Sequence, residues 1–63
     1  MNKDYQLIAI NDNAEVIVAK EFGAWVPVHE AVATMREFYP EAIAVLDAWD
    51  YRPLWAEKFV SFS

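Results

Sequence analysis

The sequence predicts an α+β fold: a small antiparallel sheet of four strands with one amphipathic helix packed on one face, in the chain order ββαββ. Three observations support this prediction. Two β-prone segments flank a cluster of turn residues, one segment has helical periodicity, and two further apolar segments flank the turn-like DYRP. We expect a single domain, 1–63, because a chain of 63 residues buries only about 60% of its unfolded surface and has little core to divide.

The first two predicted strands form a hairpin. YQLIAI at Tyr5 to Ile10 and EVIVAKEF at Glu15 to Phe22 are rich in β-branched and aromatic residues. The intervening NDN favours a turn, because Asn and Asp side chains bond nearby backbone groups and tolerate left-handed geometry. We therefore expect a turn from Asn11 to Ala14, with Gly23 ending the second strand.

One amphipathic helix is predicted between Pro27 and Pro40. Proline suits the start of a helix and cannot continue one, so both limits have a physical cause, and Glu30 lies near the positive end. The apolar residues recur at spacings of three and four, which is the pattern of one helical face. They are Val28, Ala31, Val32, Met35, Phe38 and Tyr39.

The segment EAIAVLDAW, Glu41 to Trp49, is ambiguous. Its apolar spacing fits a helix, yet it is short and ends in the turn-like DYRP. We predict a strand; the alternative is a second helix over Glu41 to Trp49, which would give ββαα. LWAEKFVSF, Leu54 to Phe62, is then a fourth strand, joined to the third by a turn at Asp50 to Pro53.

Both faces of the predicted sheet carry large apolar side chains. Neighbours along a strand point to opposite faces, and this alternation separates pairs such as Leu7 and Ile8, Ile17 and Val18, or Leu54 and Trp55. One helix of about three turns covers only one face of four strands. We therefore expect the second face to be covered by a second copy, in a homodimer, or by a partner protein.

Composition argues against several classes of protein. Ten acidic and five basic residues give a formal charge of −5, and the basic residues are scattered, which disfavours direct binding of nucleic acid. No apolar run approaches the roughly 18 residues of a membrane span, and MNKDYQ lacks the features of a signal peptide. Together with the absence of cysteine, these features predict a cytoplasmic protein without membrane contact.

No catalytic, cofactor-binding or metal site is predicted, and we expect the protein not to be an enzyme. His29-Glu30 resembles the start of a zinc-protease helix, but the position of the second histidine is Ala33. Asp47 and Asp50 could form a pair of catalytic carboxylates, yet nothing indicates a substrate pocket beside them. The single glycine excludes glycine-rich phosphate loops.

The stretch LDAWDYRPLW, Leu46 to Trp55, is the strongest candidate site, since it holds two tryptophans, a tyrosine, two aspartates and an arginine. Large aromatic residues often complete the core of a small domain. Trp, Tyr and Arg are also the residue types that dominate binding energy at protein interfaces. Both interpretations predict a hairpin whose outer side carries the candidate protein-binding residues Asp47, Trp49, Asp50, Tyr51, Arg52 and Trp55.

These features predict a non-enzymatic protein-binding module, and we expect an inhibitor that covers a functional surface of a larger host protein. The tiny, acidic, cysteine-free profile resembles that of accessory and inhibitor proteins of phages and mobile elements, including anti-CRISPR and DNA-mimic proteins. In the DNA-mimic version, acidic residues imitate spaced phosphates if they share one face: Glu21, Glu30, Glu37, Glu41, Asp47 and Asp50. The alternatives are a structural or regulatory homo-oligomer assembled through the apolar sheet face, and a small enzyme or ligand carrier.

Overall fold

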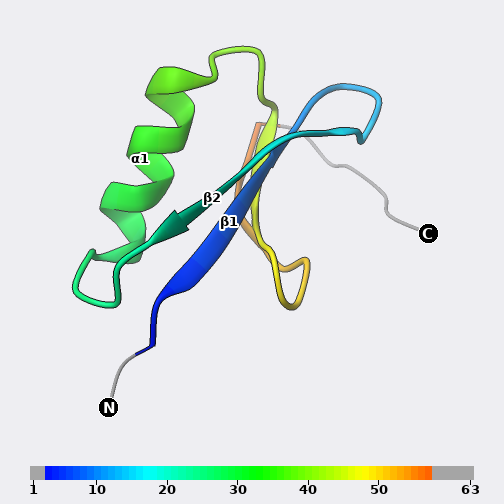
Figure 1. The fold of residues 1–63 in the computed structure, drawn as a ribbon. Helices are drawn as coiled ribbons and strands as arrows, with labels where there is room; N and C mark the ends of the chain where they lie inside the picture. The colour runs from blue at the N-terminus through cyan, green and yellow to red at the C-terminus, as the bar shows by residue number, and fades with distance from the viewer. Residues whose placement is uncertain (1–2, 58–63) are drawn as a thin grey trace.

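The computed structural model describes residues 3–57 and shows a four-stranded antiparallel sheet with one helix on one face (Figure 1). The strands lie in the order β2-β1-β3-β4, so β2 and β4 are the outer strands. The predicted α+β fold class is confirmed, with the elements in ββαββ order: β1 (Tyr5–Ile10), β2 (Val16–Phe22), α1 (Val28–Phe38), β3 (Ala44–Asp47) and β4 (Pro53–Ala56).

The helix begins and ends where the prolines predict. The carbonyl oxygen of Pro27 accepts hydrogen bonds from the backbone nitrogens of Glu30, at 3.0 Å, and Ala31, at 3.1 Å. These are the first bonds of α1, and proline tolerates this position because the first helical turn leaves its backbone donors unused. At the other end, the backbone nitrogen of Tyr39 donates to the carbonyl oxygen of Met35 at 2.9 Å. Pro40 is the next residue and cannot continue the helix.

The ambiguous segment forms a strand over Ala44–Asp47, so the helical alternative is wrong. β3 pairs with β1 along four residues, from Leu7 opposite Asp47 to Ile10 opposite Ala44. This pairing satisfies backbone groups on the second side of β1 that a helix would leave unpaired inside the domain. β4 ends at Ala56, and the last residues of the longer predicted strand, 58–62, lie outside the described residues.

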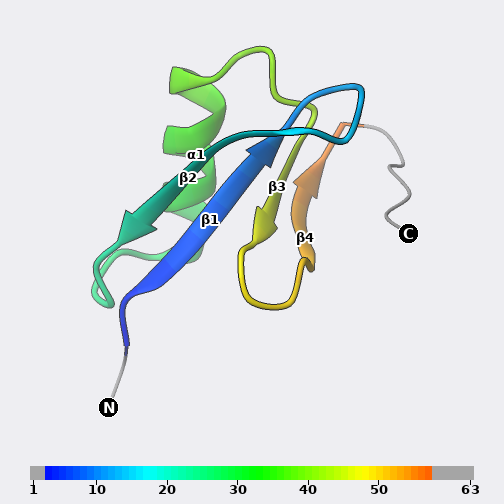
Figure 2. The ribbon, with the colours of Figure 1, turned by 45° about the vertical axis from the view of Figure 1, so that its right-hand side comes forward.

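The helix connects β2 to β3 across β1. Both strands are antiparallel to β1, so they run parallel to each other, and the connection between them must cross one face of the sheet. Figures 1 and 2 show α1 lying on that face, where Ala31 and Met35 pack in a helix-side core with Leu7, Ala9 and Val45. Within residues 3–57, no helix is long and apolar enough to span a membrane.

Two β-bulges interrupt the predicted alternation of side chains. The register of β1 with β2 and that of β3 with β4 each shifts, which leaves Ile17 and Leu54 without an opposite residue. At a bulge two residues of one strand oppose a single residue of its neighbour, so the alternation is lost locally. Ile17 and Leu54 consequently pack against the helix-side core together with their neighbours Val18 and Trp55.

Among residues 3–57, the second face of the sheet carries a smaller apolar cluster than the sequence predicts. It consists of Ile8, Ile10, Ala44 and Leu46, with Ala48 packed beside them. All four are buried, and both Ile10 and Leu46 are 0% exposed. The bulges account for part of the difference, because they turn Ile17 and Leu54 toward the helix. These four residues therefore form no exposed apolar patch.

Candidate functional site

The predicted hairpin joins β3 to β4, and its tip is shaped by Asp47 (Figure 2). The backbone nitrogen of Asp47 donates to the carbonyl of Arg52 at 2.9 Å, and that of Tyr51 donates to the carbonyl of Asp47 at 2.8 Å. The Asp47 side chain accepts a second pair of bonds at Oδ1, from the backbone nitrogens of Trp49 at 2.7 Å and Asp50 at 3.4 Å. An aspartate that bonds the backbone two residues later stabilises a turn. Asp47 thus has a structural role in the tip.

Residues 49–52 of the tip are exposed to solvent. Trp49 is 79% exposed and Tyr51 is 58% exposed, and Asp50 and Arg52 are exposed as well. Large aromatic side chains are mostly buried in folded domains, so packing within the chain does not explain these two rings. The tip therefore exposes two aromatic rings, the Asp50 carboxylate and the Arg52 guanidinium to solvent.

Tyr51 has a backbone conformation that suits glycine better than tyrosine. Its φ is 55°, in the left-handed region, where the Cβ of an L-residue approaches the following carbonyl oxygen. Glycine, and to a smaller extent asparagine, are the usual residues at such a position. The backbone of the turn therefore does not favour tyrosine at this position, and the ring is more than half exposed.

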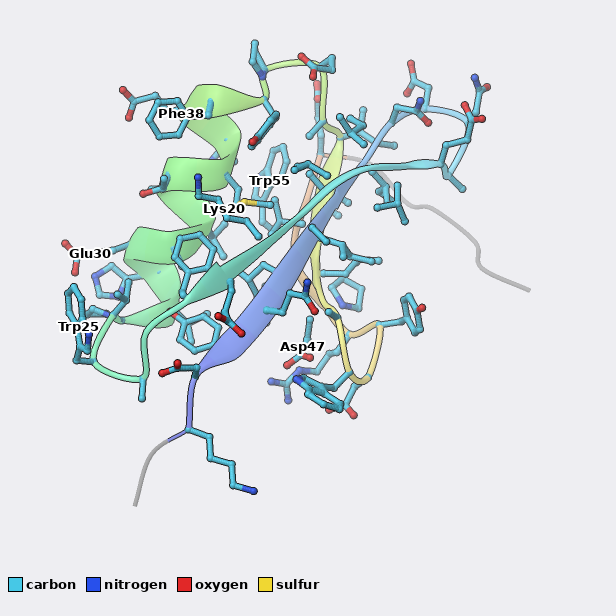
Figure 3. All side chains as sticks on the ribbon, in the orientation of Figure 1. Lys20, Trp25, Glu30, Phe38, Asp47 and Trp55 are labelled. Carbon is cyan, nitrogen blue, oxygen red and sulfur yellow. The ribbon has the colours of Figure 1, made fainter. Side chains whose placement is uncertain are left out.

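Trp55 lies apart from the tip. It belongs to β4, opposite Val45, and it is half-buried against the helix-side core. The guanidinium carbon of Arg36, in the last turn of α1, lies 4.1 Å from the centre of the Trp55 ring. Figure 3 shows Trp55 beside the helix and Asp47 at the opposite end of the hairpin. This tryptophan joins the helix to the outer strand.

A groove of about 600 Å³ lies between α1 and β4. Its lining residues are Ala33, Arg36, Glu37, Pro40, Ala42, Trp55 and Glu57. The groove contains neither His29 nor the pair Asp47 and Asp50, which were the residues considered for catalysis. Among residues 3–57, no three His, Cys, Asp or Glu side chains are grouped so that they could hold a metal ion.

Sequence reasoning missed Trp25, which is 85% exposed in the loop between β2 and α1. In this loop Val26 packs on the helix-side core, whereas Trp25 is exposed. A signal was present: Trp25 lies in a short connection between Gly23 and Pro27, and such connections run over the protein surface.

The six acidic residues that a DNA mimic needs on one face are divided between the two ends of the molecule. Glu37 and Glu41 lie near the end of α1, whereas Glu30 is in its first turn and Asp47 and Asp50 are in the hairpin. Glu21 is opposite Gln6 and therefore on the sheet face away from α1. The six carboxylates form no single row.

Comparison of the chain with protein-family models, with curated proteins and with solved structures finds no match. Functional assignment consequently rests on the geometry of these residues.

Proposed function

We propose that this domain is a non-enzymatic protein-binding module whose contact surface is the tip of the β3–β4 hairpin. The observation that carries the proposal is the exposure of Trp49 and Tyr51 on a turn that hydrogen bonds hold in place. Tryptophan and tyrosine lose little conformational freedom on binding and bury a large area, so they are frequent binding hot spots. A fixed turn lowers the ordering cost further.

The sheet edges are less suited to binding than the hairpin. β4 has four residues and begins with Pro53, which cannot donate to a neighbouring strand, while β2 is bulged at Ile17 and carries Lys20. Short edges, bulges, lysine and proline are features that hinder the addition of another strand. A partner therefore contacts loops more readily than the sheet.

The mode of action that fits so small a domain is occlusion of a functional surface on a larger protein. A contact of roughly 800 Å² on each partner forms a stable complex, and a 63-residue domain offers a surface of that size. Inhibition of this kind requires neither a pocket nor catalytic groups. The DNA-mimic version has less support, because its carboxylates are divided between the two ends.

Affinity capture with three baits tests the proposal. The baits are the wild-type chain, Trp49→Ala, and the control Phe38→Ala, which removes an exposed aromatic ring from the other end of the molecule. In extracts of the native cells, we expect a protein that wild type and Phe38→Ala retain equally and that Trp49→Ala binds about 30-fold more weakly, as for a hot-spot residue. If no captured protein depends on Trp49, the proposal is wrong.

A further inference from the structure

We propose that Trp25 is a second anchor of the same contact surface, and that the partner is a protein with a basic surface that contacts Trp25 and the hairpin tip together. This inference rests on the protein-binding function proposed above and extends it to the β2–α1 loop. We call the surface formed by Trp25, Trp49 and Tyr51 the aromatic end.

The two loops lie at the same end of the sheet, on either side of the start of β1. The backbone nitrogen of Ala24 donates to Oδ1 of Asp4 at 2.9 Å, and that of Ala48 donates to the carbonyl of Gln6 at 3.0 Å. Phe22, at the end of β2, lies opposite Tyr5, and Asp47, at the end of β3, lies opposite Leu7. Because strands are about 4.8 Å apart and rise about 3.3 Å per residue, these two strand ends are on the order of 12 Å apart. Figures 1 and 2 both show the two loops at the end of the sheet where β1 begins, with the β2–α1 loop beside β1 and the hairpin further across the sheet.

The β2–α1 loop holds Trp25 in a fixed position. The nitrogen of Val26 donates to the carbonyl of Gly23 at 2.9 Å, and the hydroxyl of Tyr5 donates to the carbonyl of Val26 at 2.6 Å. The indole of Trp25 lies against Gly23 so closely that a Cβ there would be 2.6 Å from Nε1. Hydrogen bonds within the chain thus shape both loops, and a loop shaped in advance loses less entropy on binding.

The three rings provide a substantial part of the area that a stable complex needs. An aromatic side chain buries about 150–250 Å² when it is fully covered. At the observed exposures, the two hairpin rings offer on the order of 300 Å², and Trp25 raises the sum to about 450 Å². A standard interface takes about 800 Å² from each partner, so the aromatic end supplies about half of it with apolar rings.

The charge around the aromatic end favours a different protein, rather than a second copy of this chain, as the partner. The segments 3–6, 21–30 and 47–53 border the aromatic end and carry five acidic and two basic side chains, a formal charge of −3. The acidic residues are Asp4, Glu21, Glu30, Asp47 and Asp50. Two such ends would repel each other in a homodimer, whereas a basic surface is attracted and associates faster.

Photocrosslinking tests both parts of the proposal. Benzoylphenylalanine is incorporated in the full chain at Trp25, at Trp49 or, as a control, at Phe38, and crosslinks are made in the native cells and identified by mass spectrometry. Figure 3 shows Phe38 at the opposite end of α1 from Trp25. We expect one basic protein to be trapped from both Trp25 and Trp49 and not from Phe38. With the purified protein, Trp25→Ala should weaken binding about 30-fold, and raising NaCl from about 0.1 to about 0.5 M should weaken it several-fold.

Each of the other possible crosslinking results would contradict a specific part of the proposal. Trapping from Trp49 alone would remove Trp25 from the contact and leave the hairpin proposal intact, whereas trapping from neither tryptophan would overturn both. Crosslinks to a second copy of the chain, or to an acidic protein, would show that the partner class is wrong. A crosslink from Phe38 to the same protein would move the contact onto α1.

Discussion

The hydroxyl of Tyr5 donates a 2.6 Å hydrogen bond to the carbonyl oxygen of Val26, and so ties the start of β1 to the loop that carries Trp25. The Tyr5 ring also stacks on Phe22, with ring centres 5.8 Å apart. Burial, and secondarily the Glu30 carboxylate, raise the pKa of Tyr5 above its ordinary value of 10.0. The protonated phenol is therefore the form that the fold favours.

Replacement of Tyr5 by Phe should remove this hydrogen bond and leave the ring in place. We expect the free energy of unfolding at neutral pH to fall by about 1 kcal/mol, as for a typical hydrogen bond. The raised pKa has a second consequence: wild type should lose stability as the pH rises through and above 10.0, because the unfolded chain then releases the Tyr5 proton first.

Urea denaturation at neutral and alkaline pH measures both effects. The alkaline loss should be smaller in Tyr5→Phe than in wild type, since the variant has no phenol at this position to titrate. Equal alkaline slopes in the two proteins would contradict the link between Tyr5 ionisation and stability.

Asp47 should stabilise the fold through the hydrogen bonds that its side chain accepts within the turn. Asp47→Ala removes the acceptor of the Trp49 and Asp50 backbone nitrogens, and we expect a cost of about 1 kcal/mol. Asp47→Asn keeps an acceptor oxygen and should retain most of that stability. Thermal unfolding of the two variants compares them directly, and equal losses would show that the charge of Asp47, rather than its hydrogen bonds, is what matters.

The two tryptophans of the predicted site, Trp49 and Trp55, should differ in how much they contribute to the free energy of unfolding. Trp55 is half-buried and stacked with Arg36, so Trp55→Ala should lower the free energy of unfolding by about 2–3 kcal/mol. Trp49 is exposed, and Trp49→Ala should change it by less than about 0.5 kcal/mol. Chemical denaturation monitored by circular dichroism checks both values. A large loss in Trp49→Ala would mean that the ring supports the fold, which would weaken its assignment as a contact residue.

Local signals in the sequence predict most of the fold. The bounds of α1 follow from Pro27 and Pro40, and the first hairpin follows from NDN between two β-prone segments. The bulges at Ile17 and Leu54 follow from no local signal, because a bulge depends on which residue of a neighbouring strand lies opposite. For residues 3–57, the predicted apolar second face was consequently too large.

The candidate site was predictable to a smaller extent for the same reason. Turn chemistry around Asp47 and Pro53 indicates an exposed hairpin, and the structure places Trp49 and Tyr51 at its tip. The placement of Trp55 depends on the β4 bulge and on its contact with Arg36, both of which are non-local. Trp25 was missed because its exposure depends on how β2 and α1 meet.

The left-handed conformation of Tyr51 allows function to be separated from stability. Tyr51→Gly relieves the steric cost of a φ of 55° and removes an exposed ring. The relief exceeds the entropy that glycine loses on folding, so we expect the free energy of unfolding to rise by about 0.5–1 kcal/mol while partner binding weakens. Such a result would show that the tyrosine is kept for contact at the expense of the turn. Urea denaturation measures the first quantity, and calorimetric titration with the captured protein measures the second.

Ala14 provides a matched control for this experiment, because it has a φ of 61° in the turn between β1 and β2, at the other end of the sheet. Ala14→Gly should raise the free energy of unfolding by a similar amount and leave partner binding unchanged. A loss of binding in both variants would attribute the effect to a change in the whole domain. Unchanged binding in Tyr51→Gly, together with the expected gain in stability, would exclude the Tyr51 ring from the contact surface.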